Sequence, residues 1–333
     1  MTIWPRDFGR VKDDTWTKLP VQELAQKYDS VEQHGWYDNL NPTVDRIARS
    51  IGTGERLVDY SGGTGILLER LLNRVGSKQI GALIADSSPK FLRLALEKFK
   101  DDERVAFRHL RYLREHRRLE RLDEVIEPTL LRHGFDVLVS TNAIHLYYDL
   151  DETLQSWHRS VRRRGRVYIQ SGNVSNPDAP ADSWIIDETV SHVDKIARTL
   201  VRSKSEYSDA RRFLVDDGYL AQHDRLRDKY FLPARPLSYY TEKLENAHFH
   251  VTNTSVELFA AQVSNWHKFL SVYHEGVLGW LGGAQKVTGE EADPAWVEMR
   301  QVLIGDALDQ LFEGRKQFEA CWTYVDAVRS ATD

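Results

Sequence analysis

An apolar run that ends at Asp59 is followed by the loop Tyr60-Ser61-Gly62-Gly63-Thr64-Gly65, and a second apolar run, Ile80 to Ala85, ends at Asp86. Glycines let the backbone approach a ligand closely, and the start of a helix offers N–H groups that have no partner within the helix. An acidic side chain at the end of the second run can accept hydrogen bonds from both hydroxyls of a ribose. These residues therefore predict a site for a cofactor that contains a nucleoside.

Two cofactors of this kind place different demands on the loop. A dinucleotide requires G-x-G-x-x-G, whose third glycine lets the helix pack close beneath the pyrophosphate. Gly63 and Gly65 could supply the first pair, but Leu68 then occupies the third position, and Asp59 would repel a pyrophosphate. S-adenosylmethionine carries no phosphate, so an acid beside the loop is tolerable. The residues favour S-adenosylmethionine over a dinucleotide.

The elements around the loop follow an alternating pattern of strands and helices. Apolar residues from Ile66 to Val75 recur at helical spacing, and we expect later strands at Val105 to His109, Phe135 to Ser140 and Arg166 to Ser171. Strands that alternate with helices form a parallel sheet with right-handed crossovers. The carboxyl ends of the strands then meet at one edge, where open α/β sheets bind ligands.

This stretch resembles the class I S-adenosylmethionine-dependent methyltransferases, whose first motif reads acid-x-Gly-x-Gly-x-Gly. Asp59, Gly63 and Gly65 match that motif, and Ser61 stands where the first glycine is usual. The resemblance is specific over residues 55 to 172 and only topological afterwards, where it is distantly like trans-aconitate methyltransferase. It implies an α/β fold with a Rossmann-like, seven-stranded, mostly parallel sheet and helices on both faces. It also implies S-adenosyl-L-methionine as cofactor and S-adenosyl-L-homocysteine as product.

The candidate catalytic residue is His145, which follows the fourth strand where the family's fourth motif faces the methyl group. A histidine could take a proton from a hydroxyl or ammonium nucleophile, could orient a carboxylate by a hydrogen bond, or could simply pack in the loop. The predicted cofactor-binding residues are Asp59, Ser61, Gly62, Gly63, Gly65, Asp86, Ser87 and Asn142. The predicted substrate-binding residues are Tyr28, Trp36, Tyr37 and Tyr147, and the alternative for the aromatic residues is packing of helices onto the sheet.

The chain departs from a regular α/β repeat after residue 172. We expect residues 1–172 to form N-terminal helices and the cofactor-binding core, and residues 173–235, with prolines at both ends, to form a helical lid. Residues 236–263 and 315–333 complete the core sheet, and 264–314 form a second, aromatic-rich helical insert, so that the two inserts make a mainly helical cap. Two further expectations are a loosely held arm over residues 1–18 and a charged helix over Arg114 to Arg132.

Composition limits the classes of function. The chain has 333 residues, a net charge of −5 and a single cysteine, Cys321, so a disulfide framework and a cysteine-based zinc site are excluded. We expect no metal, no membrane partner and no nucleic-acid partner, a cytoplasmic location, and a small organic molecule as substrate. A homodimer stays an open alternative, as do a peptide or RNA methyltransferase and a catalytically silent protein that binds S-adenosylmethionine.

Overall fold

The computed structural model describes residues 3–12, 15–30 and 35–331, and of Leu24, Lys27 and Tyr28 it describes the backbone alone. Seven strands form one sheet in the order β10-β11-β7-β6-β1-β2-β3. The five strands from β7 to β3 run parallel, and β11 is antiparallel to both β7 and β10. The predicted α/β fold with a seven-stranded, mostly parallel sheet is confirmed.

The strands of the large sheet are β1 (Arg56–Tyr60), β2 (Gly81–Asp86), β3 (Val105–His109), β6 (Phe135–Thr141), β7 (Val161–Ser171), β10 (Phe249–Gln262) and β11 (Gln317–Arg329). Two short pairs lie outside it, β4 (Tyr112–Leu113) with β5 (Arg118–Leu119), and β8 (Val174–Ser175) with β9 (Arg235–Pro236).

The helices of the core are η1 (Thr15–Lys18), α1 (Glu23–Asp29), η3 (Gly35–Leu40), α2 (Asn41–Ser50), α3 (Ile66–Val75), α4 (Pro89–Lys98), α5 (Leu122–Val125), α6 (Pro128–His133), η4 (Ile144–Leu146), α7 (Leu150–Ser160) and α10 (Leu237–Asn246). Those of the cap are α8 (Ile186–Ser203), η5 (Ser205–Leu214), α9 (Asp217–Tyr230), α11 (Val263–Val272), α12 (His274–Leu278), α13 (Gln285–Thr288) and α14 (Pro294–Leu311). Every helix within the described ranges is too short or too polar to cross a bilayer.

Helices cover both faces of the sheet and create two apolar cores. Side chains of α2, α3 and α4 pack on one face, and side chains of α6, α7 and α10 pack on the other. A strand covered on both faces should be continuously apolar, and every residue of β2 is buried. The helix after β2 begins with a standard cap, because the Ser88 side chain accepts a hydrogen bond from the Phe91 N–H and Pro89 follows it.

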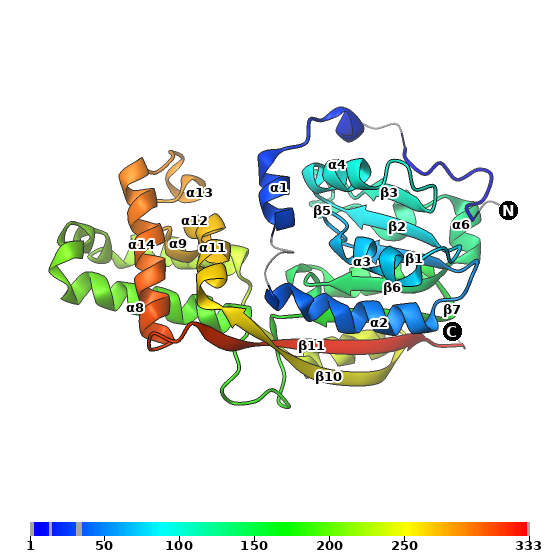
Figure 1. The fold of residues 1–333 in the computed structure, drawn as a ribbon. Helices are drawn as coiled ribbons and strands as arrows, with labels where there is room; N and C mark the ends of the chain where they lie inside the picture. Colours follow the sequence, from blue (N-terminus) through cyan, green and yellow to red (C-terminus); the bar gives the residue numbers. More distant parts are fainter. Residues whose placement is uncertain (1–2, 13–14, 31–34, 332–333) are drawn as a thin grey trace.

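The cap lies beside the core and is joined to it by the long strands β10 and β11, which extend from the sheet toward the cap helices (Figure 1). Helices of both inserts pack into a single body. The indole N–H of Trp266 donates to Thr189 at 3.1 Å, and that of Trp280 donates to Asp194 at 2.8 Å. These bonds join α11 and the loop after α12 to α8.

The structure contradicts the charged helix expected between Arg114 and Arg132. The segment instead contains the β4–β5 hairpin and the short helices α5 and α6. The alternating charges pair across turns, as in Arg111 with Glu120 and Arg118 with Glu124, and Pro128 begins a new helix rather than continuing one.

The loosely held arm expected over residues 1–18 is also wrong for the part that the structure describes. Trp4 and Phe8 are buried and stack with ring centroids 4.6 Å apart, and Trp16 is buried on the opposite face of the sheet. The Arg108 guanidinium lies over the Phe8 ring, 4.3 Å from its centroid. Aromatic burial therefore holds this segment, although most of its other residues are polar.

Candidate active site

The glycine-rich loop connects β1 to α3 at the carboxyl edge of the sheet. Ser61, Gly63 and Gly65 have positive φ angles of 62°, 55° and 80°. The N–H of Ser61 donates to the Ala85 carbonyl at 2.7 Å, which ties the loop to the end of β2. A serine in the left-handed region is unusual, and here its hydroxyl accepts a hydrogen bond from the Tyr147 hydroxyl at 2.9 Å. That bond offsets part of the strain at the position where the motif usually has glycine.

Gly65 has no room for a side chain. A Cβ there would lie 2.6 Å from the Phe99 ring and 3.1 Å from Ile84. We expect Gly65→Ala to lower the free energy of unfolding by about 2–4 kcal/mol, because it adds a steric clash to left-handed strain. Denaturant unfolding measures the loss. Gly54→Ala is the matched control, since Gly54 also has a positive φ, 86°, and open space around it. Equal losses in the two variants would refute the clash.

Asp86 joins the loop to the end of β2. One oxygen of its carboxylate accepts from the Gly63 N–H at 2.9 Å, and the other accepts from the Ser88 N–H at 2.7 Å. Burial raises the pKa of Asp86, while these N–H groups and nearby His109 oppose the rise. A carboxylate offers about four lone-pair positions, so each oxygen can accept one more bond. The neighbouring Ser87 is exposed, and its carbonyl lies 3.3 Å from the His109 ring.

Asp59 lies fully buried under the loop. Among the described residues neither of its carboxyl oxygens has a hydrogen-bond partner, and a Cβ on Gly62 would lie 2.7 Å from that carboxyl group. Burial, with a smaller contribution from the charge of Asp86, raises the pKa of Asp59 to about 8. The loop therefore folds closely over a carboxyl group that is uncharged below that pH.

This buried acid predicts a pH dependence of stability. The folded state holds the Asp59 proton up to about pH 8, whereas the unfolded chain releases it near pH 3.8. The stabilisation is complete below the lower value and is lost as the pH rises toward the higher one, by up to about 1.4 kcal/mol per pH unit. We expect Asp59→Asn to flatten this slope in denaturant unfolding between pH 5 and 8. Parallel slopes for parent and variant would contradict the prediction.

A small cavity of about 30 Å³ borders the glycine loop. It is lined by Tyr37, Leu40, Ser61, Gly62, Gly63, Thr64, Ile66, Leu67 and Thr141. Helix η3 therefore forms the wall opposite the loop. Of the predicted substrate-binding residues, Tyr37 lies in this wall and Tyr147 lies beneath the loop, where it also bonds Ser140 at 2.8 Å. The side chain of Tyr28 lies outside the described residues.

Trp36 occupies a different place from Tyr37. Its ring stacks on Trp322 of β11 with centroids 5.8 Å apart, and it contacts Trp266 and Phe269 of the cap at 5.4 and 5.7 Å. The indole N–H of Trp322 in turn donates to the Asn142 side-chain oxygen at 2.8 Å. An aromatic cluster of Trp36, Trp266, Phe269 and Trp322 thus connects the cap to the loop that follows β6.

Asn142 stands at the end of β6 with a positive φ of 54°, and its N–H donates to the Gln170 carbonyl at 2.7 Å. Gln170 donates through its side chain to Asn39, whose carbonyl also accepts from the Tyr324 hydroxyl at 2.7 Å. These buried bonds hold η3 against the sheet. Sequence reasoning missed Asn39, Gln170 and Trp322, and only Gln170 gave a signal, as a polar residue at the end of an apolar strand.

His145 lies on η4, three residues beyond Asn142, and is half-buried. Its Nδ1 atom is 2.9 Å from the Ser171 hydroxyl at the end of β7. Burial lowers the pKa of His145 to about 4. The ring is therefore neutral at pH 7, and it is a much weaker base than an unperturbed histidine.

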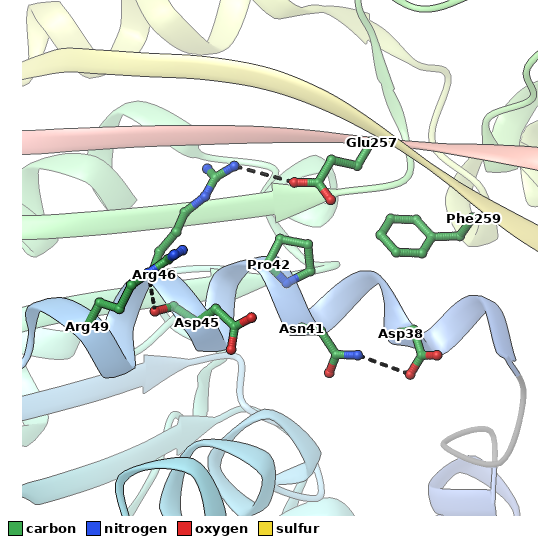
Figure 2. Close-up of a pocket in the computed structure, with 8 residues that line it drawn as sticks. All are labelled: Asp38, Asn41, Pro42, Asp45, Arg46, Arg49, Glu257 and Phe259. Atoms are coloured by element: carbon green, nitrogen blue, oxygen red, sulfur yellow. Dashed lines mark hydrogen bonds and ion pairs between the residues drawn. The ribbon is translucent and has the colours of Figure 1, made fainter.

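A larger cavity of about 440 Å³ lies between α2 and β10 (Figure 2). It is lined by Asp38, Asn41, Pro42, Asp45, Arg46, Arg49, Glu257 and Phe259, and none of the predicted site residues is among them. Its charges are largely paired, since Arg46 lies 3.0 Å from Asp326 and 3.6 Å from Glu257. Size alone therefore does not mark the site in this protein.

Comparison with known proteins gives the class of this domain. Residues 58–167, about a third of the chain, match the family model described as a methyltransferase domain. A segment of 131 residues is 28% identical to part of the hybrid PKS-NRPS synthetase apdA of Emericella nidulans. That segment covers 39% of this chain and 3% of the synthetase, so the chain spans a small fraction of that relative.

Solved structures of low similarity cover most of the chain. The YcgJ protein of Bacillus subtilis is 12% identical with a TM-score of 0.48, over 88% of this chain and 99% of that one. Phosphoethanolamine N-methyltransferase 2 of Haemonchus contortus is 14% identical with a TM-score of 0.48, over 92% and 57%. An S-adenosylmethionine-dependent methyltransferase of Geobacter sulfurreducens is 14% identical with a TM-score of 0.45, over 91% and 97%.

The chemistry of the loop residues agrees with the cofactor that the family match implies. The carboxylate of Asp86 has lone pairs left for a ribose, and the loop presents backbone with no side chain at Gly62 and Gly63. Residues 58–167 form a class I S-adenosylmethionine-dependent methyltransferase domain. S-adenosylmethionine is the cofactor that this domain implies.

Proposed function

We propose that this protein methylates a small organic molecule that binds between the carboxyl edge of the sheet and the helical cap. The observation that carries the proposal is the aromatic cluster, which brings Trp266 and Phe269 of the cap against Trp36 and Trp322 of the core, one hydrogen bond away from Asn142. An apolar, aromatic wall with a few polar groups is typical of small-molecule sites. The segment shared with the hybrid PKS-NRPS synthetase also favours a small organic substrate.

The cofactor-binding residues are assigned from the loop geometry. Asp86 accepts the ribose hydroxyls, Gly62 and Gly63 let the cofactor approach the backbone, and Ser61 and Gly65 shape the turn. Asp59 supports the loop from below, and Ser87 and Asn142 flank the site on either side of it.

S-adenosylmethionine supplies a methyl group already activated by a sulfonium, so the protein mainly aligns the acceptor and excludes water. Such alignment can contribute about 7–11 kcal/mol to lowering the barrier. The low pKa of His145, about 4, argues against a base that removes a proton from a hydroxyl or ammonium group at neutral pH. We assign His145 to orienting the substrate by a hydrogen bond. Tyr37, which lines the cavity at the loop, is assigned to the substrate wall; Trp36 packs against it, and Tyr147 supports the loop.

Two other functions compete with this one. An RNA methyltransferase would favour a continuous basic surface, but two arginines of the β4–β5 segment are paired, Arg111 with Glu120 and Arg118 with Glu124. Neither a peptide methyltransferase nor a silent cofactor-binding protein requires an arrangement of side chains that differs from the observed one.

The deciding experiment supplies S-adenosylmethionine with a labelled methyl group to the purified protein together with fractionated cell extract. We expect label in the small-molecule fraction. Label in the protein or RNA fraction would overturn the assigned substrate class. Cofactor binding by calorimetry without any transfer to the three fractions would identify a silent protein.

A further inference from the structure

Asn173 lies where the chain leaves the core sheet and enters the first insert. Its side-chain oxygen accepts from the Asp187 N–H at 2.9 Å, and its side-chain nitrogen donates to the Leu232 carbonyl at 2.8 Å. Asp187 is in the first turn of α8, and Leu232 follows α9. Asn173 is 1% exposed. A single buried amide therefore joins the beginning and the end of the helical insert.

The same short segment is fixed to the core. The Gly172 carbonyl accepts from the Ile186 N–H at 2.9 Å, and a Cβ on Gly172 would lie 2.7 Å from the Trp322 ring. Gly172 therefore lets the chain pass directly against the aromatic cluster. These contacts link the packing of α8 and α9 on the core to the position of residues 171–173.

The main chain of Asn173 extends this link to His145. The Asn173 N–H donates to the Ser171 hydroxyl oxygen at 3.1 Å, and that hydroxyl lies 2.9 Å from His145 Nδ1. A serine hydroxyl has one hydrogen to donate. Its oxygen accepts from the Asn173 N–H, and among the described residues His145 Nδ1 is the acceptor found for its hydrogen. If Nδ1 carried a hydrogen instead, the buried Ser171 hydroxyl hydrogen would have no acceptor there. Ser171 is itself 1% exposed, so water does not readily replace this partner.

The bond at Nδ1 decides which nitrogen of a neutral imidazole carries the hydrogen. A neutral ring whose Nδ1 accepts from Ser171 has its hydrogen on Nε2. That nitrogen can then donate a hydrogen bond to an oxygen of the substrate, and it cannot accept a proton there. The hydrogen bonds of Ser171 therefore indicate that His145 orients the substrate as a donor and does not act as a general base.

We propose that Asn173 and Ser171 are positioning residues that hold His145 in its Nε2–H tautomer when the cap is seated on the core. When α8 and α9 pack on the core, their hydrogen bonds to Asn173 fix the position of Ser171. The Ser171 hydroxyl then determines which nitrogen of His145 carries the hydrogen. The use of this donor by a substrate rests on the proposed function. The tautomer itself requires no substrate, so the two can fail separately.

The test records ¹⁵N spectra of the histidine rings in the full-length protein at pH 7, with His145→Gln to assign the signal. We expect the Nε2–H tautomer in the parent and a mixture of tautomers in Ser171→Ala. Ser171→Thr retains the hydroxyl and should retain the parent tautomer. An Nδ1–H tautomer in the parent, or a parent-like spectrum for Ser171→Ala, would overturn the proposal. So would a mixture in Ser171→Thr with an intact fold, because packing and not the hydroxyl would then be decisive.

Asn173→Ala tests the link to the cap. We expect it to increase hydrogen exchange in residues 186–203 and 217–230 and to mix the His145 tautomers. The matched control is Asn176→Ala, because Asn176 is also buried but donates to Thr323, at 3.2 Å, and not to α8 or α9. The control should leave the His145 tautomer unchanged. A parent-like His145 in Asn173→Ala, despite faster exchange in the cap, would remove Asn173 from the proposal.

Kinetics provide a second readout once the labelled product is known. Loss of one hydrogen bond of about 0.5–1.5 kcal/mol corresponds to roughly a 2- to 10-fold drop. We expect that drop in kcat for Ser171→Ala, with the KM for S-adenosylmethionine unchanged. Equal changes in kcat for Ser171→Ala and Asn176→Ala would indicate a general structural effect and contradict the positioning role.

Discussion

Replacement of Asp86 with alanine is expected to abolish binding of S-adenosylmethionine while the fold is retained. The variant loses an acceptor for the ribose hydroxyls, and it also loses the bonds that hold the Gly63 and Ser88 N–H groups. Hydrogen bonds to a charged group contribute about 1.5–3 kcal/mol each. Loss of two ribose contacts alone therefore predicts a rise of roughly 10²- to 10⁴-fold in Kd.

Calorimetry measures the affinity, and circular dichroism monitors the fold. Asp86→Asn retains the shape of the side chain but removes its charge. Its amide keeps one acceptor oxygen and turns an NH₂ group toward a backbone N–H donor. We therefore expect this variant also to bind S-adenosylmethionine poorly. Asp101→Ala is the control, since Asp101 is an exposed acid in the turn after α4. Unchanged affinity in Asp86→Ala would remove this residue from the cofactor site.

Replacement of His145 should distinguish an orienting histidine from a general base. A base contributes about 10²- to 10⁴-fold to turnover, and its loss would be equally severe in His145→Ala and His145→Gln. A neutral ring that donates from Nε2 can be imitated by the amide nitrogen of glutamine. We therefore expect a large drop in kcat for His145→Ala and recovery of much of it in His145→Gln, with little change in cofactor affinity.

The pH profile provides an independent check. A pKa of about 4 for His145 predicts that turnover shows no inflection from this residue between pH 6 and 8. His116→Ala, at an exposed position of the β4–β5 hairpin, is the control. An inflection near pH 6.5 that disappears in His145→Gln would support a base instead. If both His145 variants turn over like the parent, the proton acceptor must be sought at Tyr37, Tyr147 or the histidines of the inserts.

Local patterns in the sequence were sufficient for the architecture of the core. Continuous apolar runs predict strands that are buried on both faces, and the alternation of these runs with helical periodicity predicts parallel order. The strands expected from Val105 to His109 and from Phe135 to Ser140 are confirmed as β3 and β6. The loop between Asp59 and Gly65 could be located because an acidic residue and glycines at this spacing after an apolar run are typical of a cofactor-binding loop.

Charge patterns and terminal segments were less informative. The alternating signs between Arg114 and Arg132 are compatible with a helix face or with a paired hairpin, and only the contact of Arg111 with Glu120 across nine residues decides between them. Trp4 and Phe8 look like isolated aromatics in a polar arm. Their burial depends on a sheet face that is formed by strands far along the chain.

The sequence by itself determined the class of cofactor, because the motif around Asp59 and Asp86 depends on residues that lie close to each other along a βαβ unit. It did not determine the role of His145. That role depends on Ser171 from another strand, on Asn173 at the junction with the cap, and on burial that lowers the pKa of the ring. A tautomer is set by partners that meet only in three dimensions, so the tertiary structure decided whether this histidine donates or accepts a hydrogen.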